Sequence, residues 1–151
     1  MKNNEYPTWL VPLDIAQELK KIGFNEPCLY YNSEAISGMG YQCIEIEERI
    51  HNEDPNVIEL RELKYFNYNK TKGCTSIPTW EQAFEWFRKN GLFHNIAMGR
   101  DSMEEDVDFQ SYVCKEDARI VALLSQQNTY EEAREALLNK LIEVYKKLNN
   151  K

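Results

Sequence analysis

Clustered carboxylates are the most prominent side chains in the sequence that could do chemistry. The run consists of Asp101, Glu104, Glu105, Asp106 and Asp108. Carboxylate oxygens are hard ligands that suit Ca²⁺ or Mg²⁺. A calcium loop, however, places its ligands at alternate positions, with a glycine in the middle and a glutamate at the end. The run lacks that glycine and that glutamate, so we interpret it as a solvated acidic loop and predict no metal-binding residue.

Thiols and imidazoles form the second reactive group, comprising Cys28, Cys43, Cys74, Cys114, His51 and His94. A Cys–His nucleophile needs a thiolate within hydrogen-bond reach of an imidazole, and zinc sites usually contain closely spaced ligand pairs. The sequence has no C-x-x-C pair, and the motifs G-x-S-x-G, H-E-x-x-H and G-x-x-x-x-G-K-[ST] are absent. We therefore predict no catalytic and no cofactor-binding residue.

Two pairs of glutamates have the spacing of one helical turn. They are Glu81 with Glu85 and Glu131 with Glu135. Acid–base catalysis needs two carboxylates whose environments separate their pKa values. Both pairs fall in the first turns of predicted helices, where negative charge is favoured by the helix dipole, so we assign them a structural role.

Aromatic side chains make up 12% of the chain, and they have two readings. An exposed set could anchor a protein interface or stack on single-stranded bases. Base stacking would require a basic groove, whereas the chain is acidic around these positions. We favour a core role and keep a protein interface as the alternative for Trp80, Trp86, Tyr30, Tyr31, Tyr65 and Tyr68.

Capping boxes mark the two best-defined helices. Thr79 with Gln82 predicts a helix over residues 80–90 that ends at Gly91, and Thr129 with Glu132 starts a long amphipathic helix at the C-terminal end. A shorter helix is predicted over residues 14–22, with Asp14 as its N-cap.

Strand patterns occupy much of the remaining sequence. We predict strands over residues 28–31, around 44–46, and over 92–98, 107–114 and 119–125, the last three as an antiparallel meander. The stretch 57–68 is assigned to a broken strand or hairpin, and 69–76 to a loop.

These elements predict an α+β fold in one domain spanning residues 1–151. An antiparallel sheet of about five or six strands would carry the two capped helices on one face. The short N-terminal helix would cover an edge or an end of that sheet.

Composition narrows the classes of partner and compartment. The net charge of −7 opposes direct binding to nucleic acid, which needs clustered lysine and arginine. No apolar stretch has the length of a membrane span or a secretory signal. Four widely spaced cysteines are typical of reduced thiols, so we expect a cytoplasmic protein.

Three segments together resemble a known group of proteins: Leu19–Cys28 (LKKIGFNEPC), Pro78–Arg88 (PTWEQAFEWFR) and Thr129–Leu137 (TYEEAREAL). Their order and spacing are similar to small uncharacterised proteins of anaerobic gut bacteria and their prophages. The resemblance covers both ends and the middle of the chain. It implies an intracellular α+β fold and a mobile-element origin, and it carries over no active site.

The missing catalytic motifs, the acidic charge and the aromatic content together predict a small, non-enzymatic accessory protein that binds another protein. Two alternatives stay open. The first is an enzyme of unrecognised type that uses scattered Asp, Glu, Cys or His residues. The second is an acidic inhibitor that imitates nucleic acid.

Overall fold

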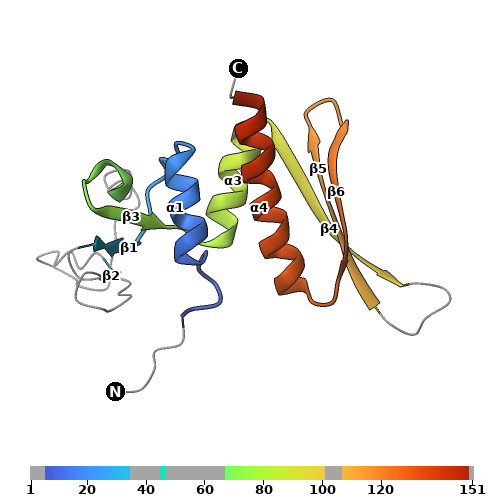
Figure 1. Ribbon diagram of the computed structural model, residues 1–151, viewed down its shortest axis with the longest axis horizontal. Coiled ribbons are helices and arrows are strands. Elements are labelled where there is room, and N and C mark those ends of the chain that lie inside the picture. The colour runs from blue at the N-terminus through green and yellow to red at the C-terminus, as the bar shows by residue number, and fades with distance from the viewer. Residues whose placement is uncertain (1–5, 35–44, 47–66, 101–106, 150–151) are drawn as a thin grey trace, which may run out of the picture. The chain divides into compact units, whose positions relative to one another are not determined.

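The computed structural model describes residues 6–34, 45–46, 67–100 and 107–149 (Figure 1). The chain divides into two compact units, Met1–Ala83 and Phe84–Lys151. The division falls inside helix α3 (Trp80–Lys89), whose first turn therefore belongs to the first unit. The single-domain organisation expected from the sequence stays a prediction.

The first unit combines helix α1 (Leu13–Lys21) with a small antiparallel sheet. The sheet has the order β2-β1-β3, with β1 at Tyr30–Ser33, β2 at Glu45–Ile46 and β3 at Cys74–Ile77. A short 3-10 helix, η2 (Tyr68–Lys70), precedes β3. Helix α1 packs against β3 and buries its apolar side, Ile15, Ala16 and Leu19.

The start of α1 differs from the prediction, because Asp14 is not its N-cap. Pro12 occupies that position without a side-chain cap, and Asp14 lies in the first turn. Val11 donates its amide to the Pro78 carbonyl at 3.0 Å, which pins the preceding chain. Because this pairing is between distant segments, the helix start is set by tertiary contacts. The helix end is as predicted, with Gly23 at a φ of 95°.

The loop predicted over residues 69–76 is wrong at its end, because β3 begins at Cys74 and pairs along its length with β1. Thr75 and Ser76 are buried despite their polarity. Ser76 donates its amide to Asn69 Oδ1 at 2.9 Å, and the Asn69 amide donates to Ser76 Oγ at 3.2 Å. These bonds replace water for buried polar groups of Ser76, so the polar stretch is accommodated in the sheet.

The second unit is a three-stranded meander with one long helix. Its strands are β4 (Leu92–Arg100), β5 (Val107–Lys115) and β6 (Ile120–Gln127), in the order β4-β5-β6. Helix α4 (Tyr130–Asn149) lies along one side of this sheet and contacts all three strands (Figure 1). Its buried residues are Ala133, Leu137, Leu138, Leu141 and Ile142. The predicted meander and C-terminal helix are confirmed.

Helix α3 also follows its prediction closely. The Thr79 amide donates to Gln82 Oε1 at 3.0 Å, and the Gln82 amide donates to Thr79 Oγ1 at 3.2 Å. These two bonds are the reciprocal pair of a capping box. Gly91 follows the helix at a φ of 77°, in the left-handed region where glycine is favoured.

The α+β class and the antiparallel pairing are confirmed, whereas the single sheet of five or six strands is corrected. The described strands form two sheets of three. Strands β4 to β6 are joined by short connections and pair with one another, so their pairing is satisfied within the second unit. On the covered face of that sheet, α4 packs as predicted, and the Phe84 ring of α3 stacks on His94 of β4.

Among the described helices, none is both long and apolar enough to cross a membrane.

Candidate interaction surface

Much of the predicted acidic cluster lies outside the described residues, together with His51, Cys43 and Tyr65. Asp108 is the one member of the acidic run that the structure describes, and it lies on β5. Within the described ranges, no three His, Cys, Asp or Glu side chains group closely enough to hold a metal ion.

The register of the second sheet separates His94 from Cys114. His94 pairs with Val113, whereas Cys114 pairs with Phe93. Since neighbouring residues of a strand point to opposite faces, the imidazole and the thiol lie on different sides of the sheet. His94 instead stacks on Phe84, with ring centroids 4.3 Å apart. His94 and Cys114 therefore do not form a Cys–His nucleophile.

Cys28 is buried and donates its thiol to the Glu26 carbonyl at 3.6 Å. Burial, with a smaller contribution from the Glu26 charge, raises the pKa of this thiol to about 12. A reactive cysteine needs the opposite shift, towards the thiolate. Cys28 is therefore a packing residue.

The glutamate pairs lie only partly in first turns, because Glu81 and Glu131 are in the first turns of α3 and α4 whereas Glu85 and Glu135 lie one turn further on. Glu85 accepts from Arg88 Nε at 2.8 Å and is also 2.6 Å from Arg88 Nη2. Glu81, Glu131 and Glu135 lie on exposed helix surface.

The two tryptophans of α3 belong to the core. Trp80 is buried and donates its indole N–H to the Thr8 carbonyl at 3.0 Å. Trp86 is buried against Tyr145 of α4, with ring centroids 5.0 Å apart. In the first unit, Tyr31 stacks on Tyr68 at 4.1 Å. The core prediction is thus confirmed for Trp80 and Trp86, whereas Tyr30, Tyr31 and Tyr68 are only partly buried.

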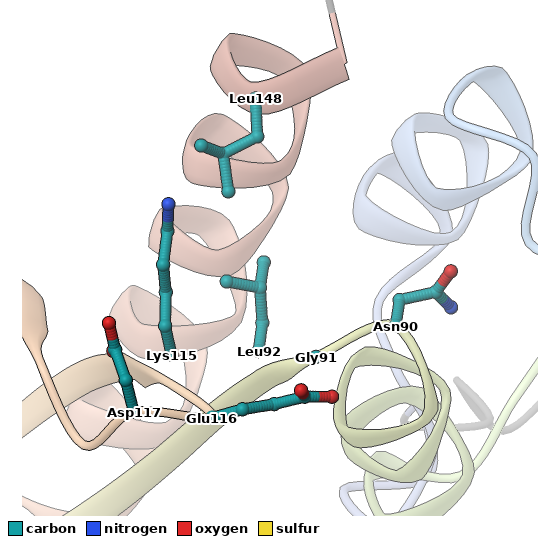
Figure 2. A pocket seen from close by; sticks show the side chains of 7 residues that line it. All are labelled: Asn90, Gly91, Leu92, Lys115, Glu116, Asp117 and Leu148. Carbon is teal, nitrogen blue, oxygen red and sulfur yellow. The ribbon is translucent and has the colours of Figure 1, made fainter.

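A hollow of about 470 Å³ opens in the second unit beside the β5–β6 turn. Figure 2 shows Glu116 extending towards Gly91, while Asn90 points away from Glu116. Leu92 and Leu148 contribute apolar surface, and Lys115, Glu116 and Asp117 contribute charge. Glu116 and Asp117 are exposed to solvent. Small-molecule sites instead have a few polar groups converging in an enclosed apolar pocket.

The feature that stands out is the side of the second sheet opposite α4, which we call the open face. The strand register aligns two rows of residues across all three strands on this side. One row is formed by Phe93, Cys114 and Ile120, and the next by Asn95, Tyr112 and Leu123. Among the described elements of the second unit, both helices contact the other side of the sheet.

The open face is unusually apolar for a solvated sheet surface. Leu123 is 68% exposed, Ile120 57% and Phe93 38%. An antiparallel sheet with one solvated face normally alternates apolar residues inside with polar residues outside. Contiguous exposed apolar surface is typical of interaction sites. The two rows contain no charged side chain, so they suit an uncharged apolar surface.

The polarity changes along the strands towards the far end of the open face. There Asp108 pairs with Gly99, and a Cβ on Gly99 would come within 2.8 Å of Asp108 Oδ1. The glycine thus leaves room for the Asp108 side chain to lie over β4. The opposite end, at the β5–β6 turn, contains Arg119, whose exposed guanidinium lies 3.6 Å from Asp117 Oδ2. The apolar rows therefore end at Asp108 on one side and at a turn of mixed charge on the other.

The free edge of β6 is less suited to binding than the face. Register shifts interrupt its pairing with β5 between Phe109 and Ser111 and between Val113 and Cys114. Gln126 has a φ of 66°, a left-handed conformation that is uncommon outside glycine. Bulges of this kind break the regular row of hydrogen-bonding groups and discourage edge-to-edge pairing.

Sequence reasoning missed the open face, although one signal pointed to it. Residues 120–124 (IVALL) are five apolar residues in succession. In a meander, a strand that is apolar on both sides indicates that both sides meet apolar surface. Strand propensity alone does not reveal this pattern.

In comparisons with known proteins, no protein-family model, curated protein or solved structure matches the chain.

Proposed function

We propose that this chain is a small, non-enzymatic protein that binds the flat apolar surface of another protein molecule through its open face. The observation that carries the proposal is the exposure of Leu123 and Ile120 in uncharged rows that cross all three strands. Burying an exposed leucine or isoleucine contributes roughly 1.5–3 kcal/mol. Covering this face would therefore supply a driving force for association.

The enzyme alternative receives little support from the described side chains. His94 and Cys114 lie on opposite sides of their sheet, and the pKa of the Cys28 thiol is raised rather than lowered. The charged hollow beside Gly91 is lined by exposed carboxylates. These arrangements do not favour nucleophilic or acid–base chemistry.

The nucleic-acid-mimic alternative would need carboxylates repeated along one face like phosphates. On α4, however, Glu143 accepts hydrogen bonds from Lys140 and Lys147, each at 2.5 Å. These bonds lower the pKa of Glu143 to about 2. Because cations are interspersed with anions along this helix, its surface does not imitate a single-sign backbone.

We place the protein in the cytoplasm as part of the same proposal. Cys28, Cys74 and Cys114 have free thiols, which fit a reducing compartment. The prophage or mobile-element origin expected from the sequence resemblance remains a proposal as well.

The test compares two variants that place the same charge at exposed leucines of the second unit. Leu123→Lys changes the open face, and Leu148→Lys changes the C-terminal end of α4, where Leu148 is 39% exposed. Tagged wild-type protein and both variants are used for affinity capture from lysate, with quantitative mass spectrometry. We expect a binding protein, including untagged copies of this chain, that is retained by wild type and Leu148→Lys and lost with Leu123→Lys. Equal retention by all three proteins would refute the open face as the interface.

A further inference from the structure

We infer that Asn90 is a site of spontaneous deamidation, which converts its carboxamide to a carboxylate, and that the last turn of α3 controls the rate of this reaction. The site goes beyond the proposed function and does not depend on the open face. Asn90 and Gly91 form the connection between α3 and β4, and they are the one Asn–Gly pair in the sequence.

The reaction uses groups that are neighbours in the chain. The backbone nitrogen of Gly91, after giving its proton to solvent, attacks Cγ of Asn90, and the new C–N bond closes a succinimide ring. The bond between Cγ and Nδ2 then breaks, and Nδ2 takes up a proton and leaves as ammonia. Water opens the ring at either carbonyl carbon. The product is aspartate, or isoaspartate where the main chain continues through the former side chain.

Glycine at position 91 removes the steric barrier to this attack. Because glycine has no Cβ, its amide can be approached closely, whereas the branched Cβ of a valine, isoleucine or threonine crowds it. The fold also requires this glycine, since its φ is 77° and a Cβ there would lie 3.4 Å from Glu116 Oε1. The residue that makes Asn90 reactive is therefore the one that the turn from α3 into β4 needs.

Solvent reaches both reacting residues. Asn90 is exposed, and Asn90 and Gly91 both line the hollow of about 470 Å³ beside the β5–β6 turn. Figure 2 shows the Asn90 side chain pointing away from Glu116. Water can therefore open the ring, and ammonia can leave, without exposure of the buried residues Phe87 and Leu92 on either side of the connection.

Two hydrogen bonds restrain the reacting groups in the folded chain. Asn90 Nδ2, the leaving group, donates to the Trp86 carbonyl at 2.7 Å, and the Gly91 amide, the nucleophile, donates to the Arg88 carbonyl at 3.0 Å. Both bonds must break before the carboxamide can turn towards a deprotonated Gly91 nitrogen. Local opening of a helix end costs less than global unfolding. The loss of two net hydrogen bonds corresponds to a reaction roughly tenfold to a hundredfold slower in the folded protein than in the unfolded chain.

Deamidation should weaken the end of α3. The carboxylate of aspartate cannot donate to the Trp86 carbonyl, and negative charge at the C-terminal end of a helix opposes its dipole. Isoaspartate also adds an atom to the main chain between the buried residues Phe87 and Leu92. Each product adds one negative charge to the net charge of −7, so anion exchange separates it from the unmodified protein.

The experiment follows deamidation of the purified full-length protein by peptide mapping with mass spectrometry, in native buffer and in guanidinium chloride at the same mildly alkaline pH. Asn128 is the internal control, since it is exposed and precedes the β-branched Thr129. We expect aspartate and isoaspartate at Asn90, formed roughly tenfold to a hundredfold faster in guanidinium chloride, with little conversion at Asn128. Conversion at Asn90 no faster than at Asn128 in guanidinium chloride overturns the site. Equal rates at Asn90 in the two solvents overturn its control by α3.

Two variants separate the chemistry from its effect on stability. Asn90→Gln keeps a carboxamide, but its extra methylene disfavours closure of the ring, so position 90 should stay unmodified in both solvents. Asn90→Asp imitates one product and should lower the equilibrium constant for folding about tenfold in urea denaturation. Modification of Asn90→Gln at the rate of wild type would overturn the succinimide route. An Asn90→Asp protein as stable as wild type would overturn the inferred weakening of α3.

Discussion

The side-chain carboxamide of Gln82 bonds both to the N-cap of α3 and to a distant segment of the chain. Its removal should therefore destabilise the protein more than removal of the Glu132 side chain at the start of α4. Gln82 Oε1 accepts from the Thr79 amide at 3.0 Å, and Gln82 Nε2 donates to the Pro27 carbonyl at 3.0 Å. At the start of α4, Glu132 Oε2 accepts from the Asn128 amide at 3.1 Å on exposed surface, and not from the Thr129 amide that a capping box would use. Gln82 therefore bonds to a distant segment, whereas this bond of Glu132 is local.

The magnitude follows from the bonds lost. Each net hydrogen bond contributes about 0.5–1.5 kcal/mol, so Gln82→Ala should lower the free energy of unfolding by about 2 kcal/mol. Glu132→Ala removes one exposed bond and should cost about 0.5 kcal/mol. Gln82→Glu keeps an acceptor for Thr79 but removes the donor to Pro27, and it should cost about 1 kcal/mol or more.

Urea denaturation followed by far-UV circular dichroism measures these differences. A shift of the midpoint at constant slope reports a change in stability rather than a change in the surface exposed on unfolding. Equal losses in Gln82→Ala and Glu132→Ala would refute the reasoning, because the bond to Pro27 would then contribute nothing. A fully stable Gln82→Glu would lead to the same conclusion.

Three further predictions concern Ser111, Ala118 and Cys28. Ser111 Oγ is buried and has no hydrogen-bond partner among the described residues, so Ser111→Ala should stabilise the protein by about 1 kcal/mol in thermal unfolding. The exposed control Ser125→Ala should be neutral, and a loss of stability in Ser111→Ala would contradict this prediction. Ala118 has a φ of 59° in the β5–β6 turn, so Ala118→Gly should raise the free energy of unfolding by about 0.5–1 kcal/mol. The control Ala136→Gly, inside α4, should lower it by about 1 kcal/mol. Equal losses in the two variants would exclude strain at Ala118. The folded-state pKa of Cys28, about 12, lies above the ~8.5 of an unfolded cysteine, so the stability from its neutral thiol is complete below about pH 8.5 and is lost as pH rises towards 12. Between pH 8 and pH 10, wild type should lose about 1–2 kcal/mol more than Cys28→Ala in urea denaturation, and equal losses would disprove this assignment.

The local elements were largely readable from the sequence. At the start of α3, Thr79 and Gln82 form the predicted capping box. At the start of α4, Thr129 Oγ1 accepts from the Glu132 amide as predicted, but Glu132 Oε2 accepts from the Asn128 amide, one residue before the predicted partner. Both helix starts nevertheless follow from residues close in sequence. The core role of Trp86 agrees with the apolar face of α3, on which it lies. The meander of β4 to β6 was also predictable, because its connections are too short for crossovers.

Tertiary structure decided the features that depend on distant partners. Cys74–Ile77 follows a polar, glycine-containing stretch and forms β3 because β1 supplies its hydrogen bonds and Asn69 bonds to Ser76. The start of α1 was set by the bond between Val11 and Pro78 rather than by Asp14.

The candidate interaction surface shows the same division. The apolar run of residues 120–124 is visible in the sequence, but the exposure of Ile120 and Leu123 is not. It follows from the register of β6 on β5 and from the choice of α4 to cover the other side of the sheet. A strand pattern specifies which residues share a face, whereas packing alone decides which of two apolar faces is buried.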